Sequence, residues 1–432
     1  MNILAILSQS LIGADLVVRL KREGHNVKLF IDSELQSTCL TGMVEKVDDW
    51  RRELPWVGKE GLIVFDDVGY GEIQDKLRLD GFSVIGGSAG GDHLELDREF
   101  GHAIFSQSGM TVTKLLSFSN PDEAIDFVSK EGGCWVVKQS DHQSTLNYVG
   151  MMSDGRDVLS VLENYKHLGI KNISLQQKLQ GVEVAVGRFF NGRDWVGPAC
   201  INFEHKPLFN GNIGPMTGEM GTLMWYEAAE ESPLFIETLA KLKSHLQKVS
   251  FKGYADINCI VNKDGVWPLE ATMRFGCPTI HLQSALQISP WGEFLKALAD
   301  GEAYDLQYKK EYGIVVSLVV PPFPFFSYTR VDPEHLLEGV IVFLKRQLSD
   351  DEYSRLCFQQ VRFENGKHRV AGVTGELAFV AGVGPTAEEA RLQAYALIDS
   401  IIVPKMFYRT DIGEKFISED KKTLHNLGWI KP

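Results

Sequence analysis

Positive charge is scarce in this sequence of 432 residues. It has 44 lysines and arginines against 57 aspartates and glutamates, which gives a formal net charge of −13. This balance argues against a broad surface for nucleic acid or for an acidic membrane, and we expect neither partner, although a local basic pocket remains compatible with it. The chain has no run of eighteen apolar residues, so we expect no membrane span. Its apolar start lacks a basic leader and a cleavage site and is interrupted by Asp15, which argues against a secretory signal. We therefore expect a cytoplasmic protein.

The motifs of several common enzyme classes are also missing. No GxSxG, HExxH, Walker A or Rossmann GxGxxG pattern occurs, so hydrolase, zinc-protease, P-loop and dehydrogenase functions lack support. The six cysteines are scattered, without a CxxC pair or the spacing of a metal finger. This scatter predicts reduced, buried thiols. The six are Cys39, Cys134, Cys200, Cys259, Cys277 and Cys357.

The first hundred residues alternate short apolar runs with helical spacing. Strands that are apolar on both faces and separated by helices indicate a parallel sheet that is covered on both sides. A helix between the first two strands stops at Gly24. We expect the strands at residues 3–7, 27–31, 61–67 and 82–87.

From about residue 97 the pattern changes. Asn120-Pro121 predicts the start of a helix that runs through Val128. Ser232-Pro233 predicts the start of a long amphipathic helix that ends at about Val249. Two strands joined by the turn at 262–265 predict an antiparallel pair. These strands are at 254–261 and 266–272, and further elements are expected at 134–138 (strand), 157–167 (helix) and 174–190 (strands).

A chain of this length is too long for one ordinary core, and we expect three segments. They are an α/β domain at 1–96, a larger α+β body at 97–305 and a small α+β piece at 306–432. The last segment is strand-rich and closes with a helix, whose start at residues 386–389 has the capping-box pattern.

Polar side chains gather on the two paired strands. Residues two apart on a strand share a face, so Asp256 and Asn258 point the same way. Glu270 and Thr272 do so on the second strand, and Arg274 continues that face. Where the two faces adjoin, they gather oxygen ligands of the kind that Mg²⁺ prefers beside nucleotide phosphates. The alternative is a solvated strand face with an incidental salt bridge, since one exposed polar face is normal in an antiparallel sheet.

Other positions are candidates on local pattern. Lys138 ends an apolar strand, where its compact charge could meet a phosphate, although strands often end in an exposed lysine. Glu204, His205 and Lys206 precede GPMTGEMG at 214–221. That stretch fits no helical or strand period, so it predicts a shaped loop whose amides can approach an anion. Without the loop, these three residues would be ordinary surface charge.

Taken together, the motifs resemble one family. GNIGPMTGEMG, GYADINCIV and PLEATMRFGCP are similar to the ATP-grasp core of the phosphoribosylamine–glycine ligases, which write GPNTGGMG and EFNxRFGDPE at the same relative places. Residues 84–100 and the FYRTDIG segment at 407–413 extend the likeness over the whole chain. The resemblance implies an ATP-grasp fold of α/β and α+β class. It would have an N-terminal parallel-sheet domain, a small nucleotide lobe at about 115–180 and a small C-terminal α+β domain.

The resemblance implies roles in nucleotide binding. Arg98, which stands in place of a lysine, and Lys138 would bind the ATP phosphates. Glu183, otherwise an unremarkable surface residue, would hold the ribose. The backbone of Lys178 and Leu179 would meet the adenine.

Metal and substrate residues follow from the same resemblance. Glu270 matches the principal ligand of Mg²⁺ (or Mn²⁺), and Asn258 falls at the usual second-strand metal position, with Asp256 beside it. Arg274 would stabilise the transferring phosphoryl group or an acyl phosphate. Amides of the glycine loop would hold the carboxylate that is activated. The remaining substrate residues would be His205, Lys206, Gly214, Pro215, Thr217 and Gly218.

Some departures fall in the ATP-grasp core. The family's glycine-rich flap over the triphosphate is replaced by SDHQSTLNY, so gripping the phosphates would fall to the backbone or to hydroxyl groups. Thr272 replaces a metal-binding asparagine, and Cys277 and Thr279 replace two acidic residues. The hydroxyl groups in question belong to Ser140, Ser144 and Thr145.

A further departure concerns the acceptor. The family grips phosphoribosylamine with GGREH and GPExPL turns, where this chain has SQSLIGADL (8–16) and FDDVGYGEI (65–73). Asp66 and Asp67 would set negative charge there, which disfavours a phosphate by like-charge repulsion or favours a cationic amine.

Three functions stay open. The first is an ATP- and Mg²⁺-dependent carboxylate–amine ligase that uses glycine or another small amino acid and an altered amine acceptor. The second is the authentic phosphoribosylamine–glycine ligase of purine synthesis, and the third a nucleotide-binding protein without turnover. In the first two the substrates are small molecules, and we expect a monomer or homodimer.

Overall fold

The computed structural model describes residues 1–139, 147–325 and 337–430. Its N-terminal part is a five-stranded sheet in the order β3-β2-β1-β4-β5, with every pairing parallel. The predicted parallel sheet is therefore confirmed. The strands are β1 (Asn2–Leu7), β2 (Asn26–Ile31), β3 (Glu45–Lys46), β4 (Leu62–Phe65) and β5 (Val84–Ile85).

Both faces of this sheet are buried. Along β1, Ile3, Ala5 and Leu7 belong to one apolar cluster, whereas Leu4 and Ile6 belong to the other. This division follows from the two-residue period of a strand. The first cluster is shared with the helices α1 (Ala14–Arg22) and α11 (Trp291–Asp300), and the second with α3 (Gly71–Leu79).

The largest sheet has eight strands in the order β16-β15-β10-β11-β14-β17-β22-β19. Each pair of neighbouring strands in it is antiparallel. The sheet crosses residue 305, so strands from the middle and the end of the chain are joined in it, and the boundary at 305/306 stays a prediction. The strands are β10 (Val182–Asn191), β11 (Trp195–Glu204), β14 (Gly221–Glu227), β15 (Lys252–Asn262), β16 (Gly265–Thr272), β17 (Tyr312–Val319), β19 (Leu356–Phe358) and β22 (Glu376–Gly384).

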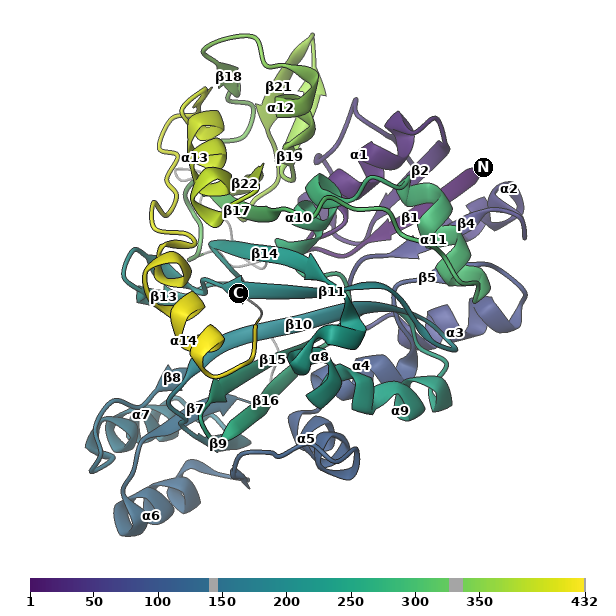
Figure 1. The fold of residues 1–432 in the computed structure, drawn as a ribbon. Coiled ribbons are helices and arrows are strands. Elements are labelled where there is room, and N and C mark those ends of the chain that lie inside the picture. Colours follow the sequence, from purple (N-terminus) through teal and green to yellow (C-terminus); the bar gives the residue numbers. More distant parts are fainter. Residues whose placement is uncertain (140–146, 326–336, 431–432) are drawn as a thin grey trace.

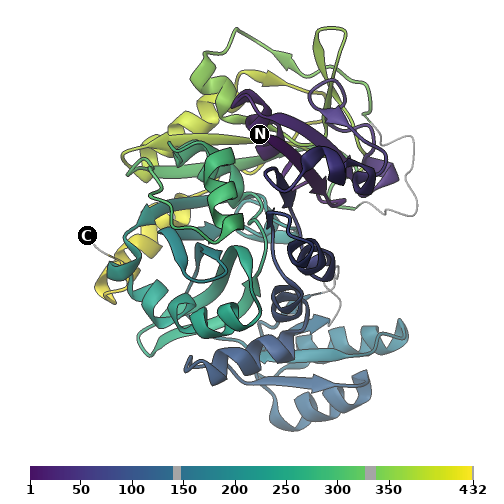
Figure 2. The ribbon, with the colours of Figure 1, turned by 90° about the vertical axis from the view of Figure 1, so that its right-hand side faces the viewer.

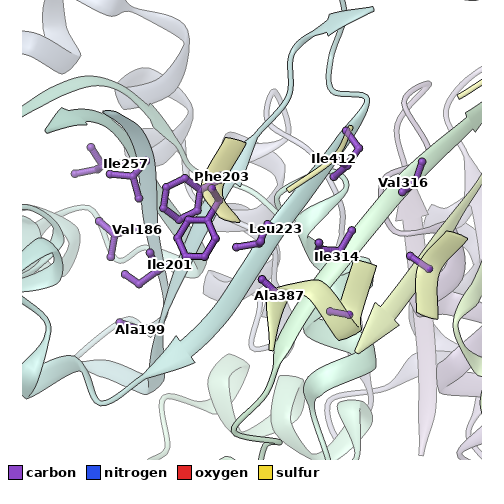
Figure 3. Packing of buried hydrophobic residues seen from close by; sticks show 14 of the residues in the cluster. Val186, Ala199, Ile201, Phe203, Leu223, Ile257, Ile314, Val316, Ala387 and Ile412 are labelled. Atoms are coloured by element: carbon purple, nitrogen blue, oxygen red, sulfur yellow. The ribbon is translucent and has the colours of Figure 1, made fainter. Parts of the chain in front are cut away.

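One side of this sheet carries the main core. Val186, Ile201, Leu223 and Ile314 lie on four neighbouring strands and are at most 1% exposed. Figure 3 shows them in one layer, with Phe203 at its centre. Burial of such side chains stabilises the sheet by about 1.5–3 kcal/mol each.

A smaller lobe projects from the molecule at the bottom of Figures 1 and 2. Its four-stranded antiparallel sheet has the order β6-β9-β7-β8 and packs on two helices around a core of its own. Asn120 caps the first of these helices by accepting a hydrogen bond from the amide of Glu123, as the sequence predicts. The elements are β6 (Leu115–Phe118), α6 (Pro121–Glu131), β7 (Trp135–Gln139), β8 (Tyr148–Val149), α7 (Arg156–His167) and β9 (Ile173–Gln177).

The remaining elements connect these layers or lie in the C-terminal part. Thr386 caps α13 by accepting a hydrogen bond from the amide of Glu389, which forms one half of the predicted capping box. Among the described residues, no helix has the length and apolarity that a membrane crossing requires. The elements are α2 (Leu54–Val57), α4 (Ala89–Leu96), α5 (Arg98–Gln107), β12 (Pro207–Phe209), β13 (Ile213–Met216), α10 (Thr279–Leu286), β18 (Phe343–Leu344), α12 (Asp350–Ser354), β20 (Val361–Glu364), β21 (Lys367–Val370), α13 (Ala387–Ile398), β23 (Ile401–Ile402) and α14 (Lys421–Asn426).

Two local predictions are wrong. The long helix expected at 233–249 is broken into α8 (Pro233–Glu237), a 3₁₀ turn and α9 (Lys243–Lys248). The break is at Thr238, whose φ of −126° and ψ of −94° are not helical and whose buried hydroxyl donates to the carbonyl of Leu234. The stretch at 214–221 is not all loop either, because its first residues belong to β13, which pairs with β12 in a hairpin.

Candidate active site

The paired strands β15 and β16 bring the predicted oxygen ligands together. Their register sets Asn258 opposite Glu270 and Asp256 opposite Thr272. Asn258 also reaches the neighbouring strands, since its Nδ2 donates to Glu204 Oε2 at 2.8 Å and to Glu183 Oε1 at 3.1 Å. Carboxylates from three strands thus converge at one edge of the large sheet.

Three cations surround Glu270. Arg98 Nη1 donates to its Oε2 at 3.2 Å, Lys138 Nζ lies 3.8 Å from the same oxygen, and Lys206 Nζ lies 3.1 Å from Oε1. These charges, Lys206 first, hold the pKa of the Glu270 carboxyl well below its usual range. Glu270 is therefore ionised, and its side chain keeps a third of its surface exposed.

Each cation comes from a different element. Arg98 begins α5, which is fixed to β16 by a hydrogen bond between His102 and the carbonyl of Leu269. Lys138 lies on β7 of the small lobe, so this lobe contributes directly to the cluster. Lys206 follows β11. The local fold therefore explains why charges that are remote in sequence meet at Glu270.

The surroundings shift the pKa values of two of these lysines in opposite directions. Burial lowers the pKa of Lys138 to about 8 despite the nearby Glu270 carboxylate. Burial would also lower the pKa of Lys206, but Glu204, at 2.9 Å, followed by Glu270 and Glu183, raises it well above its ordinary value. Lys206 is thus a fixed positive charge among three carboxylates, whereas Lys138 is close to losing its proton.

The donor set fits a divalent cation. Glu270, Glu204 and Glu183 supply carboxylate oxygens, and Asn258 Oδ1 is buried without a hydrogen-bond partner among the described residues. Oxygen-only ligands of this kind suit Mg²⁺ or Mn²⁺. Lys206 now occupies the centre of the carboxylates, which shows that the place favours positive charge.

Asp256 is directed elsewhere. Its Oδ2 accepts hydrogen bonds from Asn202 Nδ2 at 2.9 Å and from the Tyr254 hydroxyl at 3.1 Å. Burial, with a further contribution from Glu204, raises the pKa of Asp256 to about 7. These contacts make Asp256 a weaker candidate for a metal ligand than its strand neighbour Asn258.

Arg274 belongs to a second cluster. Its Nε lies 3.0 Å from Asp67 Oδ1 and 3.2 Å from Glu95 Oε1, and its Nη1 donates to the carbonyl of Phe275. Burial opposes the charge, but Glu95 and then Asp67 raise the pKa of Arg274 overall. Arg274 therefore joins the end of β16 to the parallel sheet.

Asp66 and Asp67 do not present the free negative charge that the sequence suggests. Asp67 is paired with Arg274, and buried Asp66 accepts the amides of Ser8 at 2.8 Å and Gly13 at 3.0 Å. Burial, followed by the neighbouring Asp67, raises the pKa of Asp66 to about 7. The argument from repulsion of a phosphate is therefore corrected.

The structure does not bring His205 to the charged cluster. Successive residues of a strand point to opposite faces, so Glu204 and Lys206 face the cluster while His205 faces away. His205 is 7% exposed, and its two ring nitrogens contact the carbonyl of Gly221 and the amide of Gly413. These contacts place His205 outside the cluster, and its predicted substrate role stays a prediction.

The glycine-rich stretch is held close to Lys206. The amide and hydroxyl of Thr217 both donate to the Lys206 carbonyl, the hydroxyl at 2.6 Å. Pro215 lies in β13, and exposed Gly214 has a φ of +92° and a position where a Cβ would lie 2.6 Å from the Phe209 ring. Gly218 is exposed with open space beside it.

Both residues that were predicted to meet the adenine lie in the part of the chain that the structure describes. The amide of Lys178 donates to the carbonyl of Cys134 at 3.2 Å, so it is not available to an adenine, and its Nζ donates to Gly150. Leu179 is half-buried in the link between the small lobe and β10. Ser140, Ser144 and Thr145 lie outside the described residues.

Sequence reasoning missed one acidic partner and left a second undecided. Glu95 is buried on α4, where it accepts from the amide of Met273 as well as from Arg274. Glu204 looked like surface charge, yet it pairs with Lys206 inside the cluster. The alternation of Glu204 and Lys206 about His205 is a signal that could have placed the first two on one face.

Comparison with known proteins identifies relatives over most of the chain. Residues 96–280 match the family described as phosphoribosylglycinamide synthetase, ATP-grasp (A) domain. The phosphoribosylamine–glycine ligase of Clostridium acetobutylicum is 24% identical over 353 residues, which cover 79% of this chain and 81% of that protein.

Solved structures agree on the fold. The phosphoribosylamine–glycine ligase of Thermotoga maritima superposes with a TM-score of 0.69 at 17% identity, over 95% of this chain and all of that one. An L-amino acid ligase from Bacillus licheniformis has a TM-score of 0.56 at 15% identity, over 94% of this chain and 99% of its own.

Proposed function

We propose that this chain, an ATP-grasp ligase related to phosphoribosylamine–glycine ligase, uses ATP to join the carboxylate of a small amino acid, glycine first, to an amine. The observation that carries the proposal is the Glu270 cluster. A carboxylate opposite an amide on paired strands, with Arg98, Lys138 and Lys206 within 4 Å of it, provides both metal ligands and phosphate-binding charges.

Most residues of the cluster have a role in this proposal. Glu270 and Asn258 would hold Mg²⁺ or Mn²⁺, which when bound neutralises charge on the phosphates during transfer. Arg98 and Lys138 would bind the ATP phosphates, and Glu183 would accept hydrogen bonds from the ribose. Leu179 would border the adenine.

The chemistry proceeds in two displacements. A carboxylate oxygen of the amino acid attacks the γ-phosphorus, the bond to the bridging oxygen breaks, and ADP leaves. The amine nitrogen then attacks the acyl carbon and loses a proton, and phosphate departs with the former carboxylate oxygen. Arg274, which Asp67 and Glu95 orient, would stabilise the anionic acyl phosphate.

The two turns of the first domain support an acceptor without a phosphate. A phosphate held by a turn needs backbone amides that point to it. Here Asp66 already accepts the amides of Ser8 and Gly13, and Asp92 accepts that of Gly71 at 2.7 Å. Because aspartates occupy these amides, we favour a plain or cationic amine as acceptor.

Phosphoribosylamine is the second candidate acceptor, since the curated relatives are phosphoribosylamine–glycine ligases. On that alternative the chain would act in purine synthesis, and other groups would have to hold the ribose phosphate. A protein that binds ATP without turnover is the third outcome to be tested.

ADP release separates these functions. The protein is assayed with ATP, Mg²⁺ and glycine or other small amino acids, first with a panel of amines and then with freshly generated phosphoribosylamine. We expect turnover that depends on both amino acid and amine and a poor response to phosphoribosylamine. Efficient use of phosphoribosylamine would restore the purine enzyme, and nucleotide binding without any ADP release would refute a ligase.

A further inference from the structure

A buried group of three potential metal ligands lies outside the charged clusters. Asp15, His281 and Cys357 each offer one ligand atom, and these atoms lie within 4.8 Å of one another. The three residues are 5%, 2% and 1% exposed. None of them contributes to the proposed ligase reaction, so their meeting needs a separate explanation.

The three residues come from distant parts of the chain. Asp15 lies on α1, His281 on α10 and Cys357 on β19, and α1 packs against both other elements (Figure 1). The ring of Phe379 stacks on His281 with centroids 4.4 Å apart, and Phe379 is the strand partner of Cys357. The imidazole is therefore held in place beside the thiol.

Two atoms of this group lack hydrogen bonds. Asp15 Oδ2 and His281 Nε2 are buried and have no hydrogen-bond partner in the part of the chain that the structure describes. Arg19 Nη2 lies 3.8 Å from Asp15 Oδ2 and donates its hydrogen bond to the carbonyl of Ser354. Leaving a buried polar atom unpaired costs about 1–3 kcal/mol, so two such atoms at one point indicate a missing ligand.

We propose that Asp15, His281 and Cys357 bind a structural Zn²⁺ ion. A thiolate, an imidazole and a carboxylate together form a donor set typical of zinc, whereas Mg²⁺ and Ca²⁺ take oxygen ligands. The two anionic ligands would balance the charge of the ion, and water would complete its coordination. Zinc would tie three segments of the chain together.

Zinc would meet a neutral imidazole and a protonated thiol. Burial lowers the pKa of His281 to about 4, so its imidazole is neutral and able to coordinate. Burial, with the nearby Asp15 carboxylate, raises the pKa of the Cys357 thiol well above its ordinary value. Zinc binding would displace the thiol proton.

The ion would also support the ligase site. The helix α1 begins directly after the turn that Asp66 holds, and α10 begins five residues after Arg274. A zinc ion between the two helices would fix the loops that precede them. This role is structural, because the three ligands are buried away from solvent.

Metal content and cobalt spectroscopy test the proposal. The full chain is produced with zinc in the medium, purified without chelators and analysed for metal; we expect about one zinc per chain. After chelation, added Co²⁺ should produce a thiolate-to-cobalt charge-transfer band and raise the melting temperature. Metal bound only at the Glu270 carboxylates would give no thiolate band.

Matched variants identify the ligands. Cys357→Ser and His281→Gln should lose the cobalt band and weaken zinc binding at least about 100-fold, because even residues that only support metal ligands contribute 10–100-fold. Cys134→Ser, which changes a partly exposed cysteine outside the group, should keep both. A wild-type chain without zinc and without the cobalt band would overturn the proposal and leave a buried polar cluster that holds no metal. The zinc content and cobalt band of the wild-type chain are measured without any variant, so a misfolded variant cannot obscure them.

Discussion

Glu270 is the residue on which most of the proposed chemistry converges. Three cations approach its carboxylate, and Asn258 lies across from it on the neighbouring strand. In the resting protein Glu270 pairs with all three cations, and Lys206 also pairs with Glu204 and Glu183. When ATP and a metal bind, the carboxylate would turn to the metal and the cations to the phosphates, so each charge keeps a partner.

We predict that Glu270→Gln lowers the rate of ATP-dependent amide formation at least about 100-fold. Loss of one ligand charge at the metal removes about 3 kcal/mol or more of transition-state stabilisation. The control is Glu237→Gln, since Glu237 also pairs with a lysine, at 2.7 Å, but on an exposed helix. Wild-type turnover of Glu270→Gln in a coupled ADP assay would contradict the metal assignment.

Lys138 predicts a pH dependence of ATP affinity. Its pKa is lowered to about 8, so the ammonium is charged below pH 8 and loses its charge above it. The KM for ATP should therefore rise as the pH passes upward through 8. Lys138→Arg, which stays charged, should flatten this rise, and Lys138→Ala should have a high KM at every pH. An equal slope in wild type and Lys138→Arg would show that another group titrates.

Part of the site could be predicted residue by residue. Asn258 and Glu270 are brought together by a short turn between two regular strands, and a two-residue period is enough to place them. The partners of Arg274 could not be found that way, because Asp67 and Glu95 lie about two hundred residues away in sequence. Contacts between separate sheets leave no periodic signal in either segment.

At the scale of elements, the turn after β1 is held together by a side chain from another strand. Asp66, which follows β4, accepts the amides at both ends of the turn, Ser8 and Gly13. These two hydrogen bonds fix where α1 begins and leave the turn with fewer free amides for a ligand. The same residue would thus serve both stability and the proposed choice of acceptor.

Asp66→Ala should therefore destabilise the protein. Two buried amides would lose their acceptor, which lowers the free energy of unfolding by about 1–3 kcal/mol. Urea unfolding measures the change, and Asp126→Ala on the exposed face of α6 serves as the control, with an expected change within about 0.5 kcal/mol. An unfolding midpoint equal to that of the wild type would show that water satisfies these amides.

Periodic elements were predictable, and the exceptions have local causes. Four of the five strands of the parallel sheet, β1, β2, β4 and β5, follow from apolar runs, and the capped start of α6 follows from an Asn-Pro cap. The helix predicted at 233–249 is interrupted at Thr238, where a hydroxyl competes for the backbone. The glycine-rich stretch is partly a strand because its hairpin partner, β12, supplies a pairing that its own composition does not suggest.

At the scale of the whole molecule, the site is assembled from three sheets. The small lobe supplies Lys138, the large sheet supplies Glu270 and Asn258, and the parallel sheet supplies Asp67 to Arg274. A reaction that needs ATP, a carboxylate and an amine at one place suits such a junction, since each sheet can hold one reactant. The proposed function therefore depends on the formation of an acyl phosphate from ATP and the carboxylate.

Transfer of oxygen from the carboxylate to phosphate tests that claim most directly. The protein is incubated with ATP, Mg²⁺, an accepted amine and glycine, or the amino acid that gives the fastest ADP release, with ¹⁸O in the carboxylate. Attack of the carboxylate on the γ-phosphorus followed by attack of the amine leaves one labelled oxygen in each phosphate released. The account predicts singly labelled phosphate in the same amount as amide. Unlabelled phosphate during turnover would mean that water attacks ATP directly, and it would contradict the ligase mechanism.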